Sequence, residues 1–219
     1  MADVILFGTG QMAEVAKFYL DWEGTHKVVA FTVDQQFISE PKKDGLPVVA
    51  WEELKESYPP DQVSLFCPIS YKAVNQYRKE RFLAGIERGY DFISFIHPRS
   101  YYYNTPVGRN TFIMEANVIQ PHVKIGDNCI LWSGNHIGHH TSILNHTFIA
   151  SHVVVSGGVE VGERCFLGVN ATIRDNVKLG EACVIGAAAV VLSDLPDKSV
   201  VPGTRSEISR ITSDKLRRI

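Results

Sequence analysis

An aliphatic residue recurs at every sixth position of this chain from residue 107 to residue 191. The positions are Val107, Ile113, Ile119, Ile125, Leu131, Ile137, Ile143, Ile149, Val155, Val161, Leu167, Ile173, Leu179, Ile185 and Val191. A six-residue period with an aliphatic lead is typical of a parallel β-helix, in which three hexads close one triangular coil. Residues three hexads apart therefore stack directly, and the aliphatic side chains of successive coils bury one another.

Two further positions of the hexad are restricted. The second is often glycine, and we expect these residues to serve corners that need unusual backbone angles: Gly108, Gly126, Gly138, Gly162, Gly168, Gly180 and Gly186. The fifth position is small or apolar, which predicts a second inward site. Three of the four cysteines occupy this fifth position and the other falls in a predicted strand, so we interpret them as core residues: Cys129, Cys165, Cys183 and Cys67.

The first hundred residues follow a different pattern, in which short apolar strands alternate with amphipathic helices. We expect strands at 4–7, 28–33, 62–69 and 92–96, and helices at 11–22 and 73–88. This alternation predicts a small Rossmann-like parallel sheet with helices packed on it. The predicted organisation is an α/β domain at 1–97, a linker at 98–106, an all-β β-helix domain at 107–203 and a tail at 204–219.

Charge and hydropathy argue against three features: nucleic-acid binding, a membrane span and a secretory signal. The net charge of −2 over 219 residues gives no indication of nucleic-acid binding. No apolar stretch is long enough to span a membrane, and the N-terminal residues do not resemble a secretory signal. We therefore expect a cytoplasmic protein with neither nucleic-acid nor membrane partners.

A glycine turn, Gly8-Thr9-Gly10, connects the first predicted strand to the first helix. Ligands of parallel sheets bind at the carboxyl ends of strands, where the N-terminus of a helix can hold a phosphate. Asp34 ends the second strand and is placed to accept hydrogen bonds from a ribose or a base. Alternatively, the glycines only form a tight turn and Asp34 only caps its strand. A complete dinucleotide site is not expected, because the domain is too small for the usual sheet.

The histidines of the repeat region differ in their hexad position. Four are fourth in their hexads, at corners that we expect to face outward: His122, His140, His146 and His152. The last three lie on successive faces, so one chain cannot bring them together on a metal ion. A zinc site like that of the γ-class carbonic anhydrases would need a differently spaced histidine pair, and we expect no metal.

His139 is third in its hexad, and Gly157 lies directly beneath it, three hexads further along. Acyl transfer needs a base to remove a proton from the nucleophile and a backbone N–H to stabilise the oxyanion. Spacing alone is equally compatible with a solvated corner histidine. No serine or cysteine nucleophile is evident, so direct attack on the acyl donor is expected.

The run IGHHTSI at 137–143 resembles the Ile-x-His-Asp/Glu-x-x-Ile catalytic hexad of bacterial hexapeptide-repeat sugar acetyltransferases. This group includes the bacillosamine-pathway and perosamine N-acetyltransferases and the sialic acid O-acetyltransferase-like proteins. The run SGGVEVG at 156–162 resembles their acetyl-CoA strand, VPGTR at 201–205 their closing loop, and GTGQMA at 8–13 their nucleotide-binding turn. The resemblance covers essentially the whole chain.

This resemblance implies a left-handed β-helix, acetyl-CoA as co-substrate, and a homotrimer that holds the acyl donor between neighbouring β-helices. It implies that His139 is the general base and that Gly157 donates to the thioester oxygen. Further acetyl-CoA contacts fall on Gly158 and Ala187, and the nucleotide-sugar contacts on Gly10, Gln11, Met12, Asp34, Ile69, Ser70 and Trp132.

Three residues depart from the family pattern. His140 replaces the carboxylate that orients the base; it can orient His139 as a neutral imidazole, act with His122, or be the base itself. Met12 replaces the histidine of the turn, and Trp132 replaces an asparagine of the sugar pocket. These changes leave the acceptor sugar open.

The leading hypothesis is an acetyl-CoA-dependent N-acetyltransferase that acts on a nucleotide-linked 4-amino-4,6-dideoxy sugar, as in glycan or lipopolysaccharide biosynthesis. One alternative is an O-acetyltransferase for a sugar hydroxyl, as on sialic acid. Another is a non-enzymatic trimer that binds nucleotide-sugars.

Overall fold

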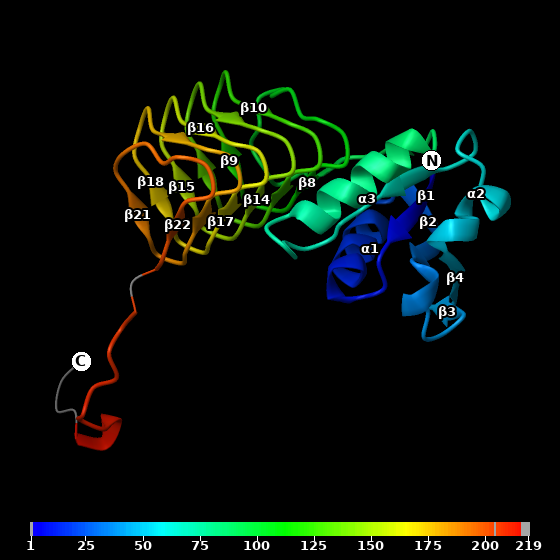
Figure 1. The fold of residues 1–219 in the computed structure, drawn as a ribbon, viewed down its shortest axis with the longest axis horizontal. Coiled ribbons are helices and arrows are strands. Elements are labelled where there is room, and N and C mark those ends of the chain that lie inside the picture. Colours follow the sequence, from blue (N-terminus) through cyan, green and yellow to red (C-terminus); the bar gives the residue numbers. More distant parts are fainter. Residues whose placement is uncertain (1, 204, 216–219) are drawn as a thin grey trace.

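The computed structural model describes residues 2–203 and 205–215 and shows a small α/β sheet packed against a triangular coil of strands (Figure 1). Thr204 of the predicted closing loop and residues 216–219 of the predicted tail lie outside the described residues. Within the described ranges, no helix has the length and apolar character needed to cross a membrane.

The α/β sheet has six strands in the order β3-β4-β2-β1-β5-β6. All neighbours are parallel except β3 and β4, which form a short antiparallel hairpin. The strands are β1 (Ala2–Phe7), β2 (His26–Val33), β3 (Lys42–Lys43), β4 (Leu46–Ala50), β5 (Ser64–Phe66) and β6 (Asp91–Phe92). The helices are α1 (Gln11–Glu23), α2 (Leu54–Ser57) and α3 (Gln76–Glu87), with 3-10 turns η1 (Gln35–Phe37), η2 (Trp51–Glu53) and η3 (Ser213–Lys215).

The coil consists of three parallel sheets, each a stack of two-residue strands. The first, called the β8 face, holds β7 (Phe95–Ile96), β8 (Phe112–Ile113), β11 (Ile130–Leu131), β14 (Phe148–Ile149), β17 (Phe166–Leu167), β20 (Val184–Ile185) and β22 (Val200–Val201). The β9 face holds β9 (Val118–Ile119), β12 (His136–Ile137), β15 (Val154–Val155), β18 (Thr172–Ile173) and β21 (Val190–Val191). The β10 face holds β10 (Lys124–Ile125), β13 (Ser142–Ile143), β16 (Glu160–Val161) and β19 (Lys178–Leu179).

The predicted hexad register is confirmed. Of the fifteen lead positions, only Val107 is partly buried, and the other fourteen are at most 4% exposed. Their side chains form one continuous core with the fifth-position residues, Cys129, Cys165 and Cys183 among them. Burial raises the pKa of the Cys129 and Cys165 thiols to about 12. The cysteines are therefore core residues, as predicted.

The corners of the coil correct the prediction about glycine. None of the seven second-position glycines has a positive φ; the left-handed angles fall on the fourth position, as at Asn128 and His140. Gly138 shows what the second position requires, because an added Cβ would lie 2.5 Å from the backbone nitrogen of Gly157 in the next coil. Glycine is needed there for the close approach of successive coils.

The observed strands differ from the expected ones in two places. The single strand expected at 92–96 divides: β6 ends the α/β sheet, whereas β7 pairs with β8 and begins the coil. Strand pairing of the coil thus starts ahead of 107, and Tyr101 of the predicted linker also pairs with the coil, at Val118. Strand β4 was not among the expected strands. It contains Pro47, which lies outside the segment that pairs with β2, where a missing N–H is tolerated.

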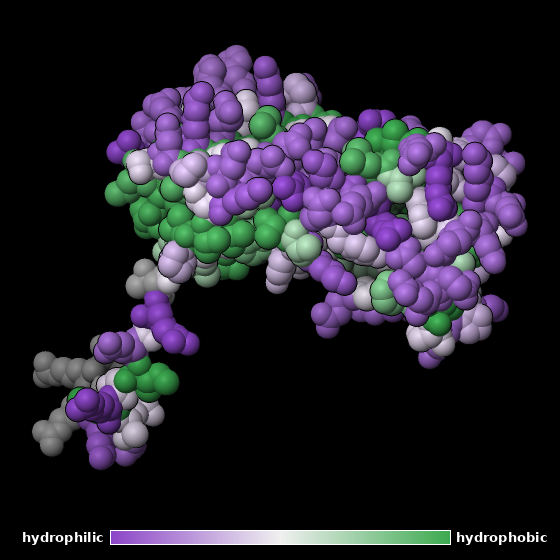
Figure 2. Space-filling model, viewed as in Figure 1, coloured by the Kyte–Doolittle hydropathy of each residue, from purple (hydrophilic) through white to green (hydrophobic). Residues whose placement is uncertain are grey.

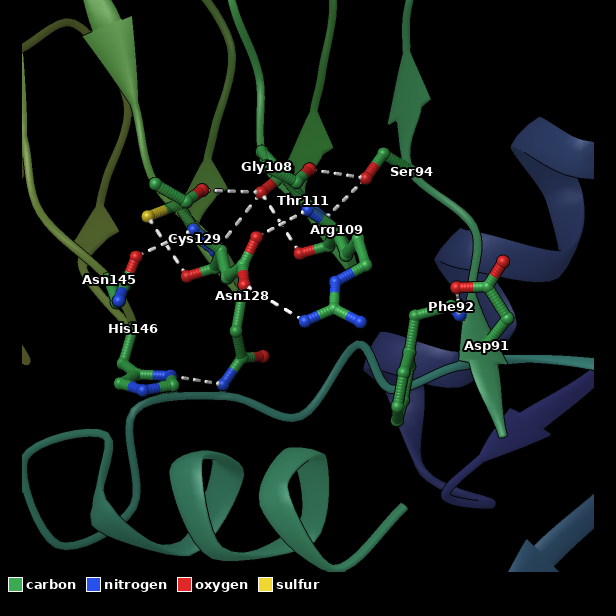
Figure 3. Close-up of polar contacts among 12 residues, drawn as sticks. Asp91, Phe92, Ser94, Gly108, Arg109, Thr111, Asn128, Cys129, Asn145 and His146 are labelled. Carbon is green, nitrogen blue, oxygen red and sulfur yellow. Dashed lines mark hydrogen bonds and ion pairs between the residues drawn. The ribbon is translucent and has the colours of Figure 1, made fainter. Parts of the chain in front are cut away.

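His146 is also placed differently from the prediction. It is 4% exposed, because α3 packs over its corner and Phe82 contacts its ring. A ladder of side-chain hydrogen bonds reaches it, in which Asn110 Nδ2 donates to Asn128 Oδ1 at 2.7 Å. Asn128 Nδ2 in turn donates to His146 Nδ1 at 2.8 Å (Figure 3). Because Cys67 N–H donates to Asn110 Oδ1 and fixes the direction of the ladder, His146 Nδ1 is an acceptor and the ring is neutral.

The buried ladder predicts that stability depends on pH through His146. Burial lowers the pKa of His146 to about 4, and the charges of Lys79 and Arg78 act in the same direction. The unfolded chain, with a pKa of about 6.5, therefore binds a proton at pH 5 that the folded chain does not. We expect this group to lower the free energy of unfolding by about 2 kcal/mol from pH 7 to pH 5, as measured by urea unfolding.

The matched control for this prediction is His146→Asn. Asparagine tolerates the left-handed backbone and can accept the same hydrogen bond from Asn128, but it does not titrate. The difference between the two proteins in pH dependence isolates His146. Equal pH dependence in both would contradict the assignment.

Candidate functional site

A cavity of about 870 Å³ opens where the carboxyl end of β1 meets the β-helix; we call it the interdomain cavity. Its wall is formed by the turn into α1, the end of β2 and the turn after it, the segment after β5, the start of α3 and one corner of the coil. They bring together six of the predicted substrate residues, Gly10, Gln11, Met12, Ile69, Ser70 and Trp132. Residues far apart in the sequence therefore share one site.

A second hollow, of about 370 Å³, continues from the first along the coil; we call it the apolar groove. The two cavities share Met12, Ser70, Tyr71 and Trp132, so they form one continuous depression. The groove ends at Ala187, which was predicted to contact the acyl donor. Its walls include an aromatic cluster in which the Tyr71 ring lies 4.7 Å from the Phe166 ring and 5.1 Å from the Phe148 ring, both centroid to centroid.

The start of α1 presents backbone donors to the interdomain cavity. Gly10 caps the helix with an extended backbone, and its carbonyl accepts from the N–H groups of Ala13 and Glu14. The N–H groups of Gln11 and Met12 have no partner among the residues that the structure describes. Unpaired N–H groups at the positive end of a helix dipole suit an anion.

Asp34 does not line the cavity. Its carboxylate is 9% exposed, pairs with Arg81 at 2.9 Å and accepts a hydrogen bond from the Tyr77 hydroxyl at 3.1 Å. Tyr77 does line the cavity, and burial raises the pKa of its hydroxyl, with Asp34 contributing. Asp34 therefore contacts the cavity only through Tyr77, whose neutral hydroxyl it holds in place by accepting its hydrogen bond.

His139 and His140 lie at the exposed corner between the β9 and β10 faces. Their Nδ1 atoms are 3.1 Å apart, within hydrogen-bond distance. The His140 ring packs on His122 of the preceding coil with centroids 4.6 Å apart, as the register predicts. In the tautomer in which His139 Nδ1 donates to His140 Nδ1, Nε2 of His139 carries no hydrogen and can take a proton.

Gly157 lies directly against the His139 ring, as expected from the spacing. A Cβ built on Gly157 would lie 2.6 Å from Cε1 and 2.8 Å from Nε2 of His139, so only glycine allows this contact. The equivalent N–H of Arg109 donates to an aspartate side chain, whereas the Gly157 N–H has no partner in the described part of the chain. The His139 ring and this N–H group are therefore adjacent, and the Gly158 N–H donates to the His139 carbonyl at 2.8 Å.

The two halves of the predicted site occupy different edges of one chain. His139 and Gly157 are at the corner that follows the β9 face, whereas Trp132 and Ala187 are at the corner that precedes it. Three of the five outward positions on the β9 face between them are valines, Val118, Val154 and Val190, which are 37%, 39% and 60% exposed; the other two are His136 and Thr172. Figure 2 shows such hydrophobic surface gathered along one side of the β-helix.

Tyr71 lines the interdomain cavity beside the predicted Ile69 and Ser70. The structure also identifies a residue that the sequence did not assign to the site, Tyr77 of α3. The available signal for Tyr77 was its position near the start of the helix that follows the predicted strand. Among the described residues, no group of three or more His, Cys, Asp or Glu side chains is arranged to hold a metal ion.

Comparison with known proteins agrees with the sequence resemblance. The family model for bacterial transferase hexapeptide repeats (six repeats) matches residues 104–139 and 158–193. Comparison with curated protein sequences gives no match.

Solved structures match nearly the whole chain. A mutant of perosamine N-acetyltransferase from Caulobacter crescentus, in complex with CoA and GDP-perosamine, is 28% identical with a TM-score of 0.82, covering 93% of this chain and 94% of that one. The acetyltransferase domain of PglB from Neisseria gonorrhoeae, in complex with acetyl coenzyme A, is 22% identical with a TM-score of 0.82, covering 92% and 96%. WeeI from Acinetobacter baumannii is 16% identical with a TM-score of 0.79, covering 91% and 96%.

The last two structures share the fold, and the first adds similarity in sequence over the same length. The match extends through the α/β sheet as well as the coil, so the arrangement of both parts is common to these proteins. The chain carries bacterial transferase hexapeptide repeats in the two matched segments and is an acyltransferase built on a left-handed β-helix.

Proposed function

We propose that this acyltransferase moves the acetyl group of acetyl-CoA to the amine of a nucleotide-linked 4-amino-4,6-dideoxy sugar. The observation that carries the proposal is the contact between the His139 ring and Gly157, whose N–H has no partner among residues 2–203 and 205–215. The similarity to a perosamine N-acetyltransferase that holds CoA and GDP-perosamine supports this class of acceptor.

The interdomain cavity takes the nucleotide in this proposal. The N–H groups of Gln11 and Met12 bind the diphosphate at the start of α1. The sugar then extends into the apolar groove, between Met12, Tyr71 and Trp132. A wall of this kind favours the methyl group of a 6-deoxy sugar over a hydroxymethyl group, which would lose its hydrogen bonds to water.

The complete site is formed by two copies of the chain. One chain holds His139 and the apolar groove at opposite edges of the β9 face, so they cannot act together on one amine. A cyclic homotrimer places the His139 edge of one copy beside the groove of the next and buries the exposed valines of the β9 face. The acyl donor then lies between two β-helices, with Gly157 and Gly158 of one copy and Ala187 of its neighbour beside it.

The chemistry requires only proton transfer and charge stabilisation. His139 Nε2 takes a proton from the amine as its nitrogen attacks the thioester carbonyl carbon, and a C–N bond forms. The Gly157 N–H stabilises the negative charge that develops on the carbonyl oxygen. When the C–S bond breaks, the CoA thiolate leaves and takes the proton from His139. His140 orients the base through its Nδ1.

Replacing the base tests its role. We expect His139→Ala to lower turnover by roughly 10²–10⁴-fold, because a positioned general base contributes that much. Acetyl-CoA affinity, measured by calorimetry, should change little. His26→Ala removes a histidine at the far end of the α/β sheet and serves as control. Unchanged turnover in His139→Ala would contradict the assignment.

Subunit mixing tests the composite site. Gly10→Trp should fill the interdomain cavity without backbone strain, because Gly10 has a φ of −86° and an added Cβ meets nothing within 4 Å. His139→Ala and Gly10→Trp should each be nearly inactive. Randomly mixed trimers should recover about a quarter of the active sites, since half of the bases and half of the grooves are intact.

The mixing result separates the two arrangements. If base and groove came from the same chain, every site in a mixed trimer would carry one defect and no activity would return. Mixed trimers of His139→Ala with wild-type chains provide the reference for assembly and activity in the same assay.

A further inference from the structure

One buried side chain connects α3, the cavity wall and the coil. Arg78 is 0% exposed, and its guanidinium makes six hydrogen bonds. Nη1 donates to the carbonyls of Ile69 at 3.1 Å and Ser70 at 3.3 Å, and also to Asn75 Oδ1 at 3.0 Å. The other three bonds end on backbone carbonyls of the coil: Asn128 at 3.2 Å, His146 at 2.7 Å and Thr147 at 3.3 Å.

This arginine has no carboxylate partner in residues 2–203 and 205–215. Burial lowers its pKa to about 10, which still leaves it charged at neutral pH. A buried charge is costly, and an apolar residue of similar volume often stabilises a fold equally well. What the guanidinium provides instead is a rigid fork of donors that fixes the relative positions of three segments.

The segment held by Arg78 is strained. Ala73, Val74 and Asn75 are consecutive residues with φ of 53°, 51° and 61°, a conformation that a β-branched valine rarely adopts. Such strain persists only where the surroundings enforce it, and it tends to occur at functional sites. Asn75 holds the backbone in this conformation, because its buried side chain donates to the carbonyls of Arg164 and Cys165, both at 2.9 Å.

The strained turn directly follows the wall of the interdomain cavity. Ile69, Ser70, Tyr71 and Lys72 line that cavity, and Ser70 and Tyr71 also line the apolar groove. We propose that Arg78 is a positioning residue that, with Asn75, locks this wall onto the coil in the shape that binds a nucleoside diphosphate. The identity of the ligand rests on the proposed function, whereas the lock itself does not.

The test compares Arg78→Met, Arg78→Lys and Asn75→Gly with the wild-type protein. We expect Arg78→Met to raise the dissociation constant for the nucleoside diphosphate that wild type binds, among UDP, GDP and dTDP, by about tenfold or more, because the wall must be ordered on binding. Amide exchange in residues 69–75 should become faster. Acetyl-CoA affinity should stay within about twofold, since its proposed backbone contacts do not involve this wall.

The other variants separate locking from folding. Arg78→Lys keeps the charge with fewer donors and should give an intermediate effect. Asn75→Gly relieves the backbone strain but removes the bonds to the coil, so it should also weaken diphosphate binding even if Arg78→Met fails to fold. The control is Lys79→Met, which removes a contact between the same helix and Glu163 but touches no cavity residue, and should bind normally.

Two results would overturn the proposal: unchanged diphosphate affinity in Arg78→Met and Asn75→Gly, or unchanged exchange of residues 69–75 in both. A parallel loss of diphosphate and acetyl-CoA affinity would show a general structural role and would also overturn it. If wild type binds none of the three diphosphates, the proposed function fails, and the exchange measurement still decides whether Arg78 locks the wall.

Discussion

The six-residue register of the coil is the constraint on which the rest of the structure depends. Inward aliphatic side chains are buried only if each stacks on the next coil, so a shift of one residue would expose the entire core. The register therefore also determines which outward-facing side chains of successive coils are neighbours. It places the His139 ring on Gly157, and it sets Trp132 and Ala187 along a different edge. The proposed division of the site between two copies follows from the same geometry that stabilises the fold.

The repeat also explains which features could be predicted from the sequence. The inward leads, the buried cysteines and the stacking of His122 on His140 all depend on spacing alone, and all are observed. The burial of His146 was not predictable in this way, because it depends on α3 packing over the coil from 68 residues earlier in the chain. The contribution of Asp34 through Tyr77 likewise depends on a contact between separate elements.

Polar contacts between the α/β sheet and the coil have a different role from the aliphatic core. The core makes each part stable, but apolar packing tolerates small displacements, whereas directional hydrogen bonds do not. The Asn110–Asn128–His146 ladder and the six bonds of Arg78 join the two parts through buried groups. Since the interdomain cavity has walls from both parts, its shape depends on these bonds. In the proposed function, substrate recognition thus depends on this polar interface between the two parts.

The most direct test of the account is release of free CoA thiol from acetyl-CoA in the presence of UDP-, GDP- and dTDP-linked 4-amino-4,6-dideoxy sugars. Each amino sugar is paired with the matching sugar that carries a hydroxyl at the same carbon. The account predicts release with an amino sugar on one nucleotide and little with its hydroxyl counterpart. Release with the hydroxyl sugars alone would show an O-acetyltransferase. No release with any acceptor, despite measurable binding of acetyl-CoA, would contradict the proposed reaction.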